Sequence, residues 1–168
     1  TNNTLGIAGL NWGAQVLPVR VSGKCGALVS DLLDGLRWAA GLPVSGLPAN
    51  PTPARVINLS FGGDAPCSQA YQDTIDAVTA EGALVVVAAG NDGNTPDNAI
   101  TPPASAPSVI TVGGFDDKNR LSRHYYDMYH SSYGPTIDGI MKPELIAPGI
   151  WVAAPILPKT PLYEEAEA

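Results

Sequence analysis

One continuous apolar run constrains the fold of this chain more than any other feature. Residues 83–89 read ALVVVAA and are followed at once by Gly90-Asn91-Asp92-Gly93. A short run that is rich in β-branched residues and has no polar alternation predicts a strand covered on both faces, as strands of parallel sheets are. The run therefore favours an α/β fold.

The segments before this run alternate between strand and helix patterns. Strands are predicted at Gln15–Val21, in spite of Pro18 inside it, and at Arg55–Ser60. Each is followed by apolar residues at helical spacing, and the two helical patterns end at Gly41 and Gly82. The apolar positions are Leu28, Leu32, Leu33, Leu36, Ala39 and Ala40 in the first pattern, and Tyr71, Ile75 and Val78 in the second. This order predicts consecutive parallel strands joined by helical crossovers.

The second half of the chain is less regular. Ser108–Gly114 (SVITVGG) predicts a further strand, whereas Tyr125–Tyr133 is aromatic and polar without a clear period. The tail from Pro155 onward is rich in proline and then acidic. No internal repeat or second domain is indicated, so we interpret residues 1–168 as part of one domain, with 155–168 either the start of an insert or a disordered tail.

Charge and hydropathy exclude two classes of partner. The 9 basic and 16 acidic residues give a net charge of −7, which is unfavourable for binding a phosphate backbone, so no nucleic-acid partner is expected. No apolar run approaches the roughly 20 residues needed to cross a bilayer, so no membrane partner is expected. The N-terminus, Thr1-Asn2-Asn3-Thr4, lacks the pattern of a signal peptide.

Unusual chemistry follows two of the predicted strands. Ser60-Phe61-Gly62-Gly63 follows one, and the segment from Ala88 to Gly93 follows the other. Ligands of open α/β sheets bind beyond the carboxyl ends of strands, and glycines there let a ligand approach the backbone. The alternative is that both segments are tight turns, in which Asn and Gly accept left-handed backbone. The pattern by itself leaves both interpretations open.

Seven segments between Asn2 and about Ala153 carry further information: NNTLGIAG, VLPVRV, VINLSFGG, VVVAAGNDG, PPASAPSVITVGG, SSYGP and KPELIAPG. In this order they resemble the subtilisin-like serine proteases (subtilases, peptidase family S8). The secreted bacterial members are most similar, because they share the KCG and APCS segments. The resemblance implies a three-layer α/β/α fold, here incomplete, with a parallel sheet and helices on both faces. It also implies a secreted protein that hydrolyses peptide bonds of a polypeptide substrate.

The resemblance assigns roles to several residues. Asn91 matches the asparagine that donates to the oxyanion of the tetrahedral intermediate. Ser60, Phe61 and Gly62 match one wall of the first specificity pocket, where Phe61 replaces the usual Leu and narrows or reshapes the pocket. Two further segments match the opposite wall and the other edge along the extended substrate. These are Ala88, Ala89 and Gly90 for the wall, and Gly26, Ala27 and Leu28 for the edge.

The catalytic triad of the family has no counterpart in this chain. The nucleophile motif Gly-Thr-Ser-Met-Ala and the His-Gly-Thr motif are absent, and the only histidines are His124 and His130, in the aromatic stretch. The orienting aspartate of the family lies upstream of its histidine. The chain is therefore interpreted as the central part of a catalytic domain, and by itself it is predicted to be inactive.

The resemblance also implies a structural calcium ion in the intact protein. Its ligands would be the Asn3 side-chain oxygen and the carbonyls of Thr1, Leu5 and Ile7, all hard oxygen donors; in the isolated fragment this stretch is expected to be a disordered stub. The Pro102–Pro103 bond matches a cis site of the family. His124 and His130, near Asp116, Asp117 and Asp127, match no metal motif and are expected in a solvated loop.

Cys25 and Cys67 follow the first and second predicted strands, at the same edge of a parallel sheet. A disulfide between them is expected; two free thiols are the alternative.

Two rival functions and one further partner remain open. A phosphate- or nucleotide-binding module would require a glycine-rich turn that opens into a helix, and no Walker or dinucleotide fingerprint is present. A non-catalytic scaffold derived from the protease fold is the second rival. A fragment of a larger sheet also exposes strand edges, so a homodimer of the fragment is expected to be possible.

Overall fold

The computed structural model describes residues 9–63, 68–93, 100–150, 152, 158–159 and 163–164. Leu17–Ile150 form one compact unit, which contains the helices and strands named below. The other unit combines residues 1–16 and 151–168, and in its described part the Asn11 side chain accepts a hydrogen bond from the Gly13 N–H at 2.9 Å. Among the described residues, no helix has the length and apolar character that crossing a membrane requires.

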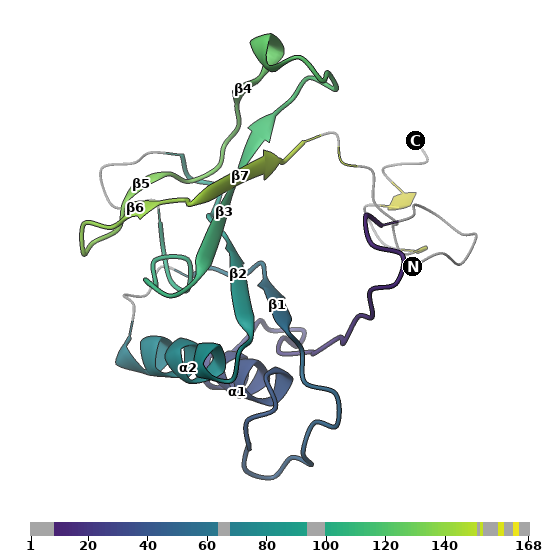
Figure 1. Cartoon of the computed structure of the whole chain (residues 1–168), viewed down its shortest axis with the longest axis vertical. Coiled ribbons are helices and arrows are strands. Elements are labelled where there is room, and N and C mark those ends of the chain that lie inside the picture. Colours follow the sequence, from purple (N-terminus) through teal and green to yellow (C-terminus); the bar gives the residue numbers. More distant parts are fainter. Residues whose placement is uncertain are drawn as a thin grey trace. The chain divides into compact units, whose positions relative to one another are not determined.

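Four of the five strands in the main sheet of the larger unit are parallel (Figure 1). β1 (Val56–Leu59) pairs with β2 (Leu84–Ala88), β2 with β3 (Ile110–Asp116), and β3 with β7 (Leu145–Pro148), all in parallel. The predicted strands at 55–60, 83–89 and 108–114 are thereby confirmed, as is the parallel arrangement.

Three short strands, which no sequence pattern predicted, complete the sheets. β4 (Asp127–Met128) runs antiparallel to the end of β3, and β5 (Gly134–Pro135) and β6 (Met141–Lys142) form a separate antiparallel pair.

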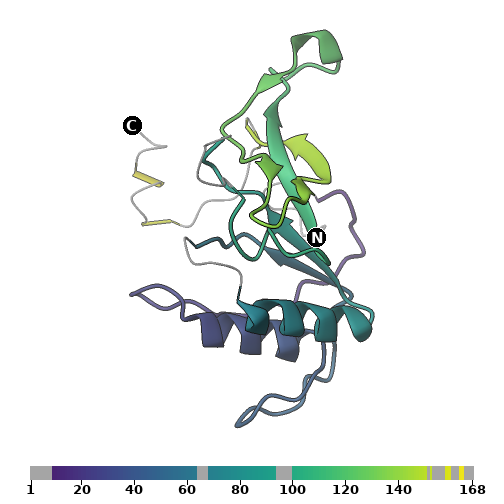
Figure 2. The ribbon, with the colours of Figure 1, turned by 90° about the vertical axis from the view of Figure 1, so that its left-hand side faces the viewer.

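Both helices of the unit cover the same face of the sheet. α1 (Val29–Ala39) and α2 (Gln69–Ala80) lie side by side beneath the strands in Figures 1 and 2. The burial of β2 alternates accordingly: Val85 and Val87 are buried on the face that packs against the helices, and Leu84 and Ala88 are exposed on the opposite face. The α/β fold is confirmed, and its layers in the described part of the chain are one sheet and one layer of helices.

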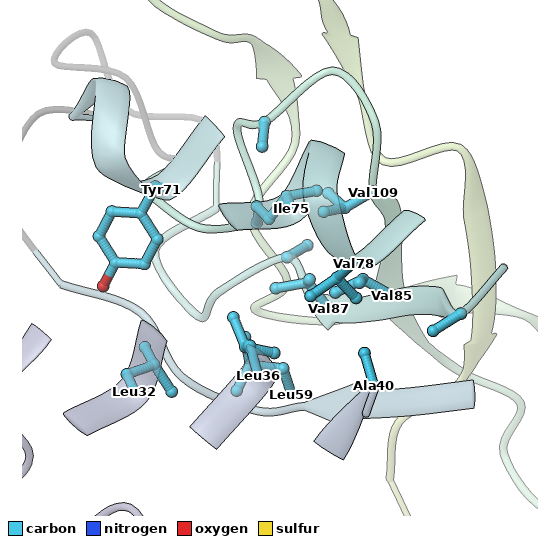
Figure 3. Packing of buried hydrophobic residues seen from close by; sticks show 14 of the residues in the cluster. Leu32, Leu36, Ala40, Leu59, Tyr71, Ile75, Val78, Val85, Val87 and Val109 are labelled. Atoms are coloured by element: carbon cyan, nitrogen blue, oxygen red, sulfur yellow. The ribbon is translucent and has the colours of Figure 1, made fainter. Parts of the chain in front are cut away.

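The hydrophobic core lies between these helices and the sheet (Figure 3). Ile75, Val78 and Val87 are completely buried, and Leu32 and Leu36 of α1 pack against the same cluster. Both helices end at the predicted glycines, because Gly41 and Gly82 have φ values of 90° and 82°, a left-handed conformation that favours glycine after a helix.

The strand predicted at Gln15–Val21 is wrong. No residue of this segment belongs to a strand. Pro18 removes one ladder donor, and the side chains of Val19 and Val21 instead lie close to Gly35 of α1. A Cβ atom at Gly35 would lie 2.4 Å from Val21 Cγ1, so this glycine is what lets the segment approach the helix.

The aromatic stretch after β3 folds back onto that strand. The 3₁₀ helix η1 (Arg123–Tyr125) precedes β4, and the rings of Phe115 and Tyr126 lie 4.8 Å apart between centroids. The Arg120 guanidinium lies 4.3 Å from the centroid of the Tyr125 ring, a cation–π arrangement. At the start of this stretch, the Lys118 ammonium group forms an ion pair with the Asp116 carboxylate at the end of β3, at 2.5 Å.

A buried lysine holds the start of β7. The Lys142 side chain is fully buried, and its Nζ donates to the Val109 carbonyl at 3.0 Å and to the Glu144 carboxylate. The same carboxylate accepts the Thr111 N–H at 2.8 Å, just before the β3–β7 ladder begins. Partial burial alone would raise the pKa of Glu144, but the hydrogen bonds from Lys142 and Thr111 outweigh it and lower the pKa from 4.5.

Candidate active site

The two strand ends that carry unusual residues lie next to each other. Leu59 and Val87 are register partners in the β1–β2 ladder, so Ser60 and Ala88 continue adjacent parallel strands at the same edge of the sheet. Ser60 and Ala88 are exposed, and Phe61 is 37% exposed, whereas Ala89 is buried. The structure therefore brings the two predicted pocket walls together at the carboxyl edge of the sheet, where α/β folds bind ligands.

The turn that carries Asn91 begins and ends at a glycine. Gly90 has φ of 108° and Gly93 has φ of 64°, values that side chains rarely adopt. Asn91 itself is exposed and makes no hydrogen bond within the described part of the chain, so its amide group is available to a ligand. The tight-turn interpretation and the ligand interpretation are thus both compatible with this backbone.

A distant segment, residues 130–133, holds this turn. The Gly93 N–H donates to the His130 carbonyl at 3.1 Å, and the Tyr133 N–H donates to the Gly93 carbonyl at 3.2 Å. Ser132 makes two further bonds: its N–H donates to the Gly90 carbonyl, and its Oγ accepts from the Asp92 N–H, both at 3.0 Å. Sequence patterns gave no signal for these contacts.

A buried proline pair lies behind the first wall. A Cβ atom at Gly62 would lie 3.3 Å from Thr101 Oγ1, so the wall passes close to Thr101. The Pro102–Pro103 bond that follows is cis, as predicted, and both prolines are buried.

The third predicted substrate segment lies before α1. Gly23 and Gly26 exchange backbone hydrogen bonds of 2.9 and 3.2 Å across a tight turn, and Gly26 has φ of 103°. Ala27 is exposed and Leu28, the residue before the first turn of α1, is 68% exposed. In the described part of the chain no hydrogen bond joins this segment to the two strand ends.

Several predicted residues lie outside the described residues. These are the four calcium ligands Thr1, Asn3, Leu5 and Ile7, and also Cys67. Cys25 is exposed with a free thiol in this structure. The calcium site and the disulfide both stay predictions.

The two histidines lie in the exposed aromatic stretch. His124 belongs to η1, and the His130 ring lies 5.4 Å from that of Tyr129 between centroids. Among the described residues no group of three or more His, Cys, Asp or Glu side chains is placed to hold a metal ion.

An open cavity of about 410 Å³ lies over the end of the sheet. Its lining includes Gly113 and Ile146 from β3 and β7, Tyr126 and Tyr129 from the aromatic stretch, and Ser131 and Ser132. Ser132 thus joins the wall of this cavity to the turn that carries Asn91.

Comparison with known proteins gives a consistent result. Residues 1–164 match the family described as the subtilase family, Peptidase S8. The chain is 43% identical over 149 residues to the extracellular basic protease of Dichelobacter nodosus, covering 89% of this chain and 22% of that protein. It is 50% identical over 112 residues to an extracellular protease of Xanthomonas campestris, covering 67% and 19% of the two chains.

Solved structures of proteases share the fold. A protease from Pseudoalteromonas arctica superposes with a TM-score of 0.72 at 41% identity, covering 88% of this chain and 40% of that one. The structure of sphericase superposes with a TM-score of 0.57 at 25% identity, covering 77% and 41%. This chain therefore spans about a fifth of the length of the first two relatives and about two fifths of these solved chains.

Proposed function

The chain belongs to the subtilase family of serine proteases, and from this premise we propose that it is the central part of a secreted endopeptidase. The parent protein would hydrolyse peptide bonds of polypeptide substrates through an acyl-enzyme. Membership of the family supports the reaction type, and two relatives that are named extracellular proteases support secretion.

Asn91 is proposed as the oxyanion donor of that enzyme. When the serine oxygen adds to the scissile carbonyl carbon, its proton passes to the base and the carbonyl oxygen becomes negative. The Asn91 side-chain N–H₂ then donates to this oxygen. The observation that carries the proposal is that Asn91 is exposed, has no hydrogen bond in the described part of the chain, and lies at the end of β2.

The exposed residues around Asn91 are proposed to bind the substrate. Ser60–Gly62 and Ala88–Gly90 would form the two walls of the first pocket, and Gly26–Leu28 would flank the extended substrate as an added strand edge. The adjacency of the β1 and β2 ends supports the two walls. Phe61 would contact a substrate side chain, and its exposure of 37% supports this proposal.

The test is kinetic and uses the full-length protein that contains this chain. We expect Asn91→Ala to lower kcat by about 10²–10³-fold, the effect of losing such a donor in a member of this family, with KM little changed. Asp117→Asn, in the loop after β3, is the matched control and should retain kcat. A kcat within threefold of the unchanged protein for Asn91→Ala would contradict the assignment.

A second experiment tests the role of the fragment. The 168-residue chain lacks the nucleophile and base motifs of the family, so we propose that it is inactive alone. A fluorophosphonate probe, which reacts with activated serines, should label the full-length protein and leave the isolated chain unlabelled. Covalent labelling of the isolated chain would refute this proposal.

Calcium, the disulfide and self-association are proposed on the same premise. Thr1, Asn3, Leu5 and Ile7 would supply oxygen ligands to a structural calcium ion in the intact protein, which calcium titration by calorimetry tests. A Cys25–Cys67 disulfide would lower the intact mass by two hydrogens under non-reducing conditions.

The isolated chain is proposed to form a homodimer through exposed sheet edges. Among the described strands β1 is the terminal strand and pairs only with β2, which supports an uncovered edge. Sedimentation velocity should show a concentration-dependent dimer; a monomer at all concentrations would contradict this.

A further inference from the structure

Two hydrogen bonds from one residue fix the backbone on both sides of Asn91. Ser132 donates its N–H to the carbonyl of Gly90, the residue before Asn91, and its Oγ accepts the N–H of Asp92, the residue after it. Ser132 is completely buried, whereas Asn91 is exposed. We propose that Ser132 is a positioning residue for the oxyanion donor, an inference that rests on the function proposed above for Asn91.

The turn needs such support because its own sequence provides little. Gly90 and Gly93 lie in the left-handed region, which glycine adopts readily. Glycine also has more accessible backbone conformations than any other residue, so it does little to fix the turn by itself. An oxyanion donor acts mainly through pre-organisation, since it must already point at the position where negative charge develops. A turn with a glycine at each end and no outside contact would let the Asn91 amide sample many directions.

The Ser132 hydroxyl is the part of this support that a mutation can remove cleanly. The other three bonds to the turn use backbone atoms: the N–H groups of Ser132 and Tyr133 donate to it, and the His130 carbonyl accepts from it. Only the bond from the Asp92 N–H ends on a side chain. Removing the hydroxyl therefore loosens the turn at Asp92 and leaves the neighbouring chain connections in place.

Ser131 provides the matched control. It is the same residue type, is also buried, and lines the same cavity as Ser132. Its Oγ donates to the Ser132 carbonyl at 3.5 Å, and in the described part of the chain no hydrogen bond joins its side chain to residues 90–93. A residue that merely fills space would give Ser131→Ala and Ser132→Ala the same effect, whereas a positioning residue separates them.

The first measurement does not depend on catalysis. Amide hydrogen exchange of the 168-residue chain, followed by NMR, should show the Asp92 amide exchanging at least tenfold faster in Ser132→Ala and within twofold of the unchanged chain in Ser131→Ala. Ser132→Thr, which keeps the hydroxyl and adds a methyl group beside a cavity of about 410 Å³, should restore slow exchange. Equal exchange at Asp92 in all variants would overturn the proposal.

The second measurement is the split between kcat and KM in the full-length protein. Ser132→Ala should lower kcat about tenfold with KM within twofold, Ser132→Thr should recover most of kcat, and Ser131→Ala should leave both constants unchanged. If Asn91→Ala lowers kcat and Ser132→Ala does not, the positioning role is refuted and the proposed function stands. If Asn91→Ala also retains full kcat, the proposed function fails, and the positioning role fails with it.

Discussion

The ion pair between buried Lys142 and part-exposed Glu144 predicts that the two partners contribute differently to stability. Lys142 is fully buried and Glu144 is 39% exposed, so the two partners differ in what their removal leaves behind. Glu144→Gln replaces the carboxylate by an amide, which retains one acceptor oxygen and leaves a buried ammonium without its counter-charge. Lys142→Met removes the buried charge itself and leaves a carboxylate that water already reaches.

The structure sets the size of each effect. Removing the partner of a buried charge typically costs about 3–5 kcal/mol of unfolding free energy, and because Gln retains a hydrogen bond we expect about 3 kcal/mol for Glu144→Gln. Lys142→Met leaves the Val109 carbonyl without this donor, about 1–2 kcal/mol. Its lost ion pair with a part-exposed partner adds less than about 1 kcal/mol.

Urea unfolding at pH 7, followed by circular dichroism, measures these values. The expected order is that Glu144→Gln is the least stable, Lys142→Met is intermediate, and the double variant is more stable than Glu144→Gln alone. Glu81→Gln, at the exposed C-terminal end of α2, is the matched control and should change the free energy by less than about 0.5 kcal/mol. If Lys142→Met costs as much as Glu144→Gln, the argument from a stranded buried charge is wrong.

A further measurement on Glu144→Gln and two further substitutions follow. The pKa of Glu144 is lowered from 4.5, so its contribution to stability is present above pH 4.5 and is lost as the pH falls through the folded-state pKa; acid unfolding should therefore be less steep below pH 4.5 in Glu144→Gln. Gly35→Ala should destabilise by about 1–3 kcal/mol in thermal unfolding, against the usual gain for alanine in a helix, because its Cβ would lie 2.4 Å from Val21 Cγ1; an increase in melting temperature would contradict the close approach. Gly114→Ala should displace the Tyr129 ring, whose Cδ1 would lie 2.9 Å from the new Cβ, and change the near-ultraviolet circular dichroism; an unchanged spectrum would contradict this packing.

The elements that sequence patterns predicted well are those with local causes. The run at 83–89 forms β2, and the two helices end at Gly41 and Gly82, because apolar periodicity and left-handed glycine are properties of neighbouring residues. The segment at 15–21 has the composition of a strand and is not one, because a strand also needs a partner, and here Gly35 offers a surface for packing instead.

Elements that depend on distant contacts were missed. β4, β5 and β6 have two residues each, too few to show a period, and their pairing partners alone define them. β7 carries the residues LIAP, which match no alternating pattern, and its start is fixed by the Lys142–Glu144 pair. A buried lysine has no local signature, because burial is decided by which segments meet.

The candidate site also combines features that have local causes with features that depend on distant contacts. Position at a strand end singled out the turn that contains Asn91, whereas the family resemblance alone assigned a role to that residue, and the structure brings the turn next to the end of β1. Its support comes from Ser132, forty positions along the chain, and no local pattern indicates that contact.

The turn that carries Asn91 depends on contacts with residues that are distant in the sequence. The glycines that let the chain leave β2 sharply enough to bury Ala89 and expose Asn91 also make the turn adaptable. Its direction is then set by residues 130–133, whose own position follows from the pairing of β4 with β3 and of β5 with β6. Substitutions that weaken these short pairings should therefore disturb the turn that carries Asn91, the proposed oxyanion donor, before they disturb the helical core, because the core lies between α1, α2 and the sheet and contains no residue of these pairings.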